Sequence, residues 1–157
     1  MTRVLVVGVG NIFLGDDGFG VEVARRLASR NLPDDVCVKD FGIRGFDLAY
    51  ALMDRYELTI LVDACARGEA PGTVFLIEPG PVRDAPRFEP HGMTPASVLL
   101  LVKSLGGTTG RVLVVGCEPL ELGSDEDGRI GLSTPVEAAV DEAIAMIEAL
   151  VAKAVYA

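Results

Sequence analysis

The chain lacks tryptophan and has a single histidine, and only 6% of its 157 residues are aromatic. Half of the residues are hydrophobic, so we expect a core of Val, Leu, Ile and Ala side chains in one domain spanning residues 1–157. The three cysteines show no CxxC spacing, which argues against a disulfide framework or a zinc ribbon. No apolar run approaches the roughly 20 residues of a membrane helix, and no signal-peptide pattern opens the chain. These absences make the cytoplasm the simplest expected location.

Basic residues are also in the minority, with 14 Lys and Arg against 23 Asp and Glu and a net charge of −9. An acidic surface repels nucleic acid and anionic membranes, so we exclude both as main partners. The signatures G-x-S-x-G, H-E-x-x-H and the P-loop lysine motif are absent. A serine or cysteine triad would have to use His91, and no nucleophile signature accompanies that residue. From the charge and the absence of a heptad stripe we expect a monomer.

Strand and helix patterns alternate along the chain. Near-continuous apolar runs predict strands buried on both faces, at 3–9, 58–62 and 111–117. The remaining elements expected are a strand at 36–41, an edge strand at 72–78, and helices at 19–29, 46–55, 94–105 and from 134 onward. This order predicts a single-domain, doubly wound α/β fold with a mostly parallel sheet, helices on both faces and one antiparallel edge strand. Ligands of such sheets bind beyond the carboxyl ends of the strands.

Helix-capping signals accompany three of these helices. Asp16 or Asp17 is expected near the N-cap of the helix at 19–29. Thr94 followed by proline predicts the start of the helix at 94–105. The last helix is expected to open with a capping box from Thr134 to Glu137.

Asp17, Asp63 and His91 are the candidate metal ligands. Asp17 follows the first predicted strand, Asp63 ends the third, and His91 lies in a proline-rich loop that can fold over the same sheet edge. Two carboxylates and one imidazole can hold a divalent cation and leave coordination positions open. This set suits Zn, Ni, Mn or Fe and does not select among them.

Each candidate also has a simpler interpretation. Asp17 could cap the following helix, although Asp16 could take that role and leave Asp17 free. A lone histidine such as His91 is often structural or merely exposed. Cys65 could supply a softer ligand on the same side as Asp63, but we interpret it as a small core residue.

Dinucleotide binding is a further interpretation, because Gly8-Val9-Gly10 follows a strand and Asp40 lies near the end of the next one. The third glycine of the fingerprint would fall on Phe13, whose bulk should obstruct helix packing and the approach of a pyrophosphate. The carboxylates of Asp16 and Asp17 would also place negative charge beside a diphosphate. Both observations argue against this function.

Six motifs together resemble the hydrogenase maturation endopeptidases, which process the large subunit of [NiFe] hydrogenases. The resemblance covers nearly the whole chain. The motifs are GVGNIFLGDDGFG (8–20), DFGIRG (40–45), VDA (62–64), HGMTP (91–95), VVGCEP (114–119) and GLS (131–133) before the final helix.

The resemblance implies roles for individual residues. In the family's first motif the metal-binding acid is the second of two acidic residues, which here is Asp17, and some relatives carry Glu at that place. The second ligand maps to Asp63 and the third to His91, and the same three residues are implied in catalysis. The glycine-rich turn after the second strand, which the family associates with substrate selection and cleavage, maps to Asp40, Gly42 and Gly45.

The activity implied by the resemblance is proteolysis of a nickel-loaded substrate. The enzyme would bind the nickel of the large-subunit precursor through the two carboxylates and the histidine, and then remove a C-terminal peptide. Nickel is thus supplied by the substrate, and other divalent cations could replace it in vitro. No general base is evident beyond the ligands, Asp16 and Asp40. A nickel-delivery protein or a dinucleotide-binding module without proteolytic activity is the alternative.

Overall fold

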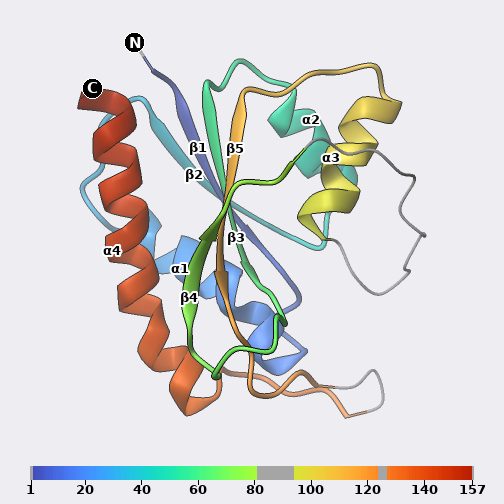
Figure 1. Ribbon diagram of the computed structural model, residues 1–157, viewed down its shortest axis with the longest axis vertical. Helices are drawn as coiled ribbons and strands as arrows, with labels where there is room; N and C mark the ends of the chain where they lie inside the picture. Colours follow the sequence, from blue (N-terminus) through green and yellow to red (C-terminus); the bar gives the residue numbers. More distant parts are fainter. Residues whose placement is uncertain (1, 81–93, 124–126, 157) are drawn as a thin grey trace.

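The computed structural model describes residues 2–80, 94–123 and 127–156. The centre of this part is a five-stranded sheet in the order β2-β1-β3-β5-β4 (Figure 1). The strands are β1 (Val4–Val9), β2 (Val36–Gly42), β3 (Leu58–Ala64), β4 (Val74–Ile77) and β5 (Arg111–Cys117). Neighbouring strands run parallel except β4, which pairs antiparallel with β5. The expected mostly parallel sheet with one antiparallel edge strand is confirmed.

Helices cover both faces of this sheet. They are the 3-10 turn η1 (Gly15–Gly18), α1 (Phe19–Ala28), α2 (Gly45–Leu52), α3 (Pro95–Ser104) and α4 (Thr134–Tyr156). Helices α1 and α4 pack on one face, and α2 and α3 pack on the other (Figure 1). This is the doubly wound arrangement that crossover connections between parallel strands produce. In the described ranges, no helix combines the length and apolar character needed to span a bilayer.

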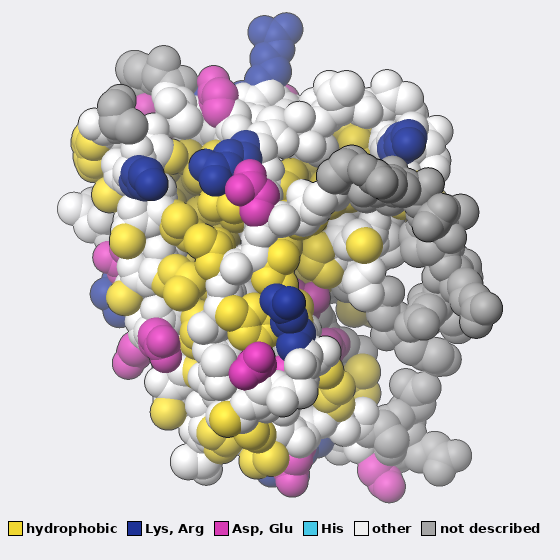
Figure 2. Space-filling view, viewed as in Figure 1, with side chains coloured by type: hydrophobic (Ala, Val, Ile, Leu, Met, Phe, Trp, Pro, Cys, Tyr) yellow, Lys and Arg dark blue, Asp and Glu magenta, His cyan; other side chains and the backbone are white. Residues whose placement is uncertain are grey.

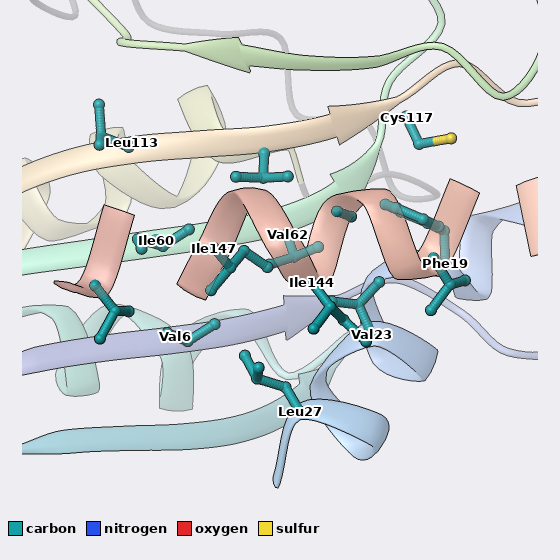
Figure 3. Close-up of a cluster of buried hydrophobic side chains, with 14 of the residues drawn as sticks. Val6, Phe19, Val23, Leu27, Ile60, Val62, Leu113, Cys117, Ile144 and Ile147 are labelled. Atoms are coloured by element: carbon teal, nitrogen blue, oxygen red, sulfur yellow. The ribbon is translucent and has the colours of Figure 1, made fainter. Parts of the chain in front are cut away.

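The core has two halves, one on each face of the sheet. Along β1, Val4 and Val6 face α1 and α4, whereas Leu5 and Val7 face α2 and α3. All four side chains are fully buried, which explains why the strand reads as a continuous apolar run. Figure 3 shows the first half, where strand residues meet side chains of α1 and α4: Val6, Ile60, Val62, Leu113, Cys117, Phe19, Val23, Leu27, Ile144 and Ile147.

The edge strand β4 is only four residues long. On the side of the molecule drawn in Figure 2, hydrophobic side chains gather over β4 and the neighbouring part of α4. Leu76 is 46% exposed there, and the Arg67 guanidinium lies over the ring of Phe75 at 5.2 Å. A short edge with a cation over one of its side chains limits unwanted pairing with other strands.

Two of the predicted helix starts can be compared with the observed caps. Thr94 caps α3, because its hydroxyl accepts a hydrogen bond from the Ser97 N–H at 3.1 Å, as expected. The capping box predicted from Thr134 to Glu137 is wrong. The Glu137 N–H donates to the carbonyl of Ser133, so Ser133 stands at the cap position, and the Glu137 carboxylate pairs with Arg26 instead.

The start of α1 also differs from the prediction. Its N-cap is Gly18, with no side-chain hydrogen bond, so Asp16 and Asp17 lie near the N-cap as expected but neither caps the helix. Both acidic residues lie within η1, which is inserted between β1 and α1. The 3-10 turn frees the two carboxyl groups for other partners.

Candidate functional site

Asp17 and Asp63 lie at the edge of the sheet where β1 and β3 end. The two strands are parallel neighbours, and Gly8 pairs with Val62, one residue before Asp63. Asp17 lies in η1, and this turn packs against β3. The parallel register therefore brings two residues that are distant in sequence to one edge, where ligands of such sheets bind.

Two glycines allow η1 and α1 to approach the strand ends this closely. A Cβ on Gly20 would overlap the backbone oxygens of Val62 and Val9, and a Cβ on Gly10 would overlap the backbone oxygen of Asp17. Gly10 also has a φ of 132°, a region that residues with side chains rarely adopt. Because the clashes would be with backbone atoms, a side-chain rotation could not relieve them.

Burial changes the ionisation of both carboxyl groups. Asp63 is 6% exposed, and burial together with the charge of Asp17 raises its pKa to about 8. Burial also raises the pKa of Asp17, against the lowering effect of a hydrogen bond that the Asn11 N–H donates to Oδ2 at 2.8 Å. Near neutral pH the pair therefore retains a proton on Asp63. A divalent cation beside the pair would stabilise both groups as carboxylates, since its charge offsets their repulsion.

Asp16 is fully buried and has a different environment from Asp17. Its carboxylate accepts hydrogen bonds from the N–H groups of Leu120 and Glu121 and from both the N–H and the hydroxyl of Ser133, at 2.7–2.8 Å. Burial acts to raise the pKa of Asp16, but these hydrogen bonds outweigh it and the pKa is lowered. An ionised carboxylate with four donors is not available as a general base.

The end of β2 lies beside the loop that carries Asp17. The Gly10 N–H donates to the Gly42 carbonyl at 3.0 Å and joins the end of β2 to the residue after β1. Asp40 Oδ1 accepts the Gly42 N–H at 2.8 Å, and Gly42 has a positive φ of 55°. Gly45 is the first residue of α2. Of the three residues expected to recognise substrate, Asp40 and Gly42 thus lie at the end of β2 beside the site, and the role of all three remains a prediction.

Cys65 follows Asp63 by two residues and is partly buried. Burial and the neighbouring Asp63 raise the pKa of its thiol to about 12, so the sulfur carries its proton at neutral pH. Its side chain packs with the half of the core under α2 and α3. These contacts agree with the interpretation of Cys65 as a small core residue.

Sequence reasoning missed Glu118, a buried carboxylate just after β5. Glu118 accepts the Arg67 N–H at 2.6 Å and the Gly68 N–H at 3.0 Å. It thereby ties the loop after Asp63 to the end of β5. Because its partners lie 51 and 50 positions away, nothing in the local sequence distinguishes it from an exposed glutamate.

His91 lies outside the described residues, so its position relative to Asp17 and Asp63 remains a prediction. Across the ranges 2–80, 94–123 and 127–156, no three His, Cys, Asp or Glu side chains form a group that could hold a metal ion. The described part of the site supplies the two carboxylates. A three-ligand site would need its third ligand from outside these ranges.

The G-x-G sequence at the end of β1 is followed by η1 rather than directly by a helix. Phe13, which we expected to obstruct helix packing, is 59% exposed in the loop before η1, so that argument is wrong. Asp16 and Asp17 do lie where we expected them to oppose a diphosphate, since η1 follows the end of β1, where a diphosphate would bind.

Comparisons with known proteins agree on one family. Residues 21–150 match the family model described as hydrogenase maturation protease. A candidate hydrogenase maturation protease of Methanocaldococcus jannaschii is 37% identical over 147 residues, which cover 92% of this chain and 93% of that protein. The hydrogenase 2 maturation protease of Escherichia coli is 32% identical over 148 residues, covering 92% and 88%. The structure of the hydrogenase maturating endopeptidase HybD from E. coli aligns with a TM-score of 0.77 at 29% identity, covering 97% of this chain and 93% of that chain. The chain therefore belongs to the hydrogenase maturation protease family and is an endopeptidase.

Proposed function

We propose that this endopeptidase removes a C-terminal peptide from the nickel-loaded precursor of a [NiFe] hydrogenase large subunit. The observation that carries the proposal is the pair of carboxyl groups, Asp17 in η1 and Asp63 near the end of β3, in a chain of this family. Burial and mutual repulsion make the pair unfavourable as two free anions. A divalent cation removes this disadvantage, and the nickel of the precursor is the cation we propose.

His91 is the third proposed ligand, and the same three residues form the proposed catalytic site. An imidazole and two carboxylates suit nickel, and three protein ligands leave coordination positions for the substrate's own ligands or for water. Nickel then belongs to the substrate and acts first as a recognition element. Only a precursor that already carries the metal would present the missing partner of the two carboxylates.

Asp40, Gly42 and Gly45 are the residues we propose for contact with the polypeptide around the cleavage site. Support comes from the Gly10–Gly42 hydrogen bond, which places the end of β2 beside the loop that carries Asp17. Asp40, also at the end of β2, is exposed. We also propose that the enzyme acts as a monomer in the cytoplasm.

The direct test is cleavage of the cognate precursor. The large-subunit precursor is purified with and without nickel, each form is incubated with the protein, and the intact mass of the product is measured. We expect the nickel-loaded form to lose a single C-terminal peptide and the nickel-free form to remain intact. A nickel-loaded cognate precursor that keeps its full mass would refute the proposal.

Single substitutions test the residues. His91→Ala, Asp17→Asn and Asp63→Asn should each abolish cleavage while the circular dichroism spectrum stays that of the folded protein. Asp54→Asn changes an exposed carboxylate and should cleave at the normal rate. Full activity in His91→Ala would remove that residue from the site. Transfer of nickel to the precursor without peptide release would instead support the nickel-delivery alternative.

A further inference from the structure

The hydrogen bonds of Asp16 join three segments of the chain. Its Oδ2 accepts the N–H groups of Leu120 and Glu121 and the Ser133 hydroxyl, each at 2.8 Å, and its Oδ1 accepts the Ser133 N–H at 2.7 Å. Leu120 and Glu121 follow β5, whereas Ser133 stands at the start of α4. Hydrogen bonds to an ionised acceptor are stronger than neutral ones, so this is a rigid junction.

Backbone hydrogen bonds hold η1 against the segment after β5 and against the loop that precedes α4. The Asp16 N–H donates to the Glu121 carbonyl at 2.9 Å, and the Gly15 N–H donates to the Arg129 carbonyl at 2.7 Å. The turn is therefore fixed from both sides. Four of these six bonds depend on the single carboxylate of Asp16, so its loss would leave only the two backbone bonds to Glu121 and Arg129 and would remove every bond to Ser133.

Asp17 is the next residue in this turn, and little else holds its side chain. Its Oδ2 accepts the Asn11 N–H at 2.8 Å, and its own N–H donates to the Leu14 carbonyl at 3.2 Å. Among the described residues, Asn11 is the one hydrogen-bond donor to this carboxylate. The direction of the Asp17 side chain thus follows from the orientation of η1.

We propose that Asp16 is a positioning residue, whose hydrogen bonds to Leu120, Glu121 and Ser133 orient η1 so that the Asp17 carboxylate faces Asp63. The paired acids of the first motif then have separate roles, since the first is buried and holds the turn and the second is presented at the site. The effect that Asp16 should have on nickel binding rests on the function proposed above. Its effect on the orientation of Asp17 is independent of that function.

A stabilising role alone is the alternative, and Glu118 offers a matched control. Glu118 is also a buried carboxylate that accepts two backbone N–H groups just after β5, but its partners are Arg67 and Gly68 rather than any part of η1. Glu118→Gln and Asp16→Asn therefore make the same chemical change at two neighbouring junctions. Only Asp16→Asn should affect Asp17.

Amide hydrogen exchange measures the orientation without any metal. The Ile147 amide of α4 reports global unfolding, so the ratio of the Asn11 exchange rate to the Ile147 exchange rate reports local opening at Asn11. In Asp16→Asn, we expect this ratio to rise about tenfold. Glu118→Gln lowers global stability and therefore speeds exchange of Ile147, but it does not loosen η1, so the Asn11-to-Ile147 ratio should not rise above the wild-type value. If Asp16→Asn does not fold, Ser133→Ala removes one of the four donors and should raise the ratio by a smaller factor.

Nickel titration of the same variants gives the second measurement. Asp17→Asn should lose nickel binding, Asp16→Asn should bind with the same stoichiometry but about 10- to 100-fold more weakly, and Glu118→Gln should bind as the wild type does. An unchanged Asn11-to-Ile147 exchange ratio in Asp16→Asn would overturn the positioning role. Normal nickel binding by Asp17→Asn would instead refute the proposed metal site, and the exchange ratio alone would then decide the role of Asp16.

Discussion

The Asp17 carboxylate acts on Asp63 through its charge. Burial is the larger cause that raises the pKa of Asp63, and the neighbouring charge of Asp17 raises it further, to about 8. Two acids from separate elements are thus placed where one of them keeps its proton at neutral pH. Such perturbed groups concentrate at functional sites because function requires them where stability alone would not. The pair makes definite predictions about stability, metal binding and pH.

Asp63→Asn should stabilise the folded protein at neutral and alkaline pH. The unfolded chain releases the Asp63 proton near 3.8 and the folded chain near 8, so the unfolded state binds fewer protons between these values. The contribution of Asp63 to stability is therefore fully present below 3.8 and is lost as the pH rises through about 8. Asparagine removes this loss, and we expect a gain of roughly 2–4 kcal/mol near pH 8.

Urea denaturation of Asp63→Asn and wild type between about pH 5 and 9 measures this difference. The gain should shrink toward pH 5, whereas the exposed-site variant Asp54→Asn should differ little from wild type at every pH. A variant that is less stable than wild type at pH 8 would contradict the raised pKa of Asp63.

Nickel binding should release a proton and become tighter with rising pH. Because Asp63 has to ionise before it can ligate a cation, the affinity should increase by about tenfold per pH unit up to about pH 8 and then level off. Isothermal titration in buffers of different ionisation enthalpy would detect the released proton. The same affinity at pH 6 and pH 8, to within about twofold, would exclude Asp63 as a nickel ligand.

Gly20→Ala should destabilise the protein severely. The new Cβ would overlap the backbone oxygens of Val62 and Val9, so α1 would have to move away from β1 and β3. Overpacking of this kind costs about 1–3 kcal/mol or more, and the shift of α1 should also weaken nickel binding. Thermal unfolding checks the prediction, with Gly80→Ala as the control, since nothing lies within 4 Å of a Cβ at that position. Equal melting temperatures for the two variants would contradict the close approach.

Glu118→Gln should lower the free energy of unfolding more than Glu121→Gln. Glu118 is 6% exposed and accepts two backbone N–H groups, which a neutral amide satisfies less well, so we expect a loss of about 1–3 kcal/mol. Glu121 forms an exposed ion pair with Arg129, and its loss should cost below about 1 kcal/mol. The denaturant midpoints of the two variants measure both changes, provided that the slope of the unfolding free energy against denaturant concentration is the same. A larger loss in Glu121→Gln than in Glu118→Gln would show that Glu118 is not a structural residue.

Local sequence signals were sufficient for the elements but not for all of their ends. The run from Val4 to Val9 is apolar at every position except its glycine, and it forms the buried parallel strand it predicts. Whether a helix cap could be predicted depends on how far away in the sequence its hydrogen-bond partner lies. Thr94 bonds a residue three positions away, and its prediction is confirmed. The predicted box at Thr134 is wrong because Ser133 takes the cap position, and the Ser133 hydroxyl donates to Asp16, which is 117 positions away.

The sequence by itself determined the fold class, the sheet edge that carries Asp17 and Asp63, and the family, because periodicity, strand ends and motifs are local properties of the chain. Only the tertiary structure decided that Asp16 is a buried acceptor rather than a helix cap, that Glu118 holds a loop, and that Asp63 keeps its proton at neutral pH. These properties depend on burial and on donors contributed by residues as far as 117 positions away, which no local pattern encodes.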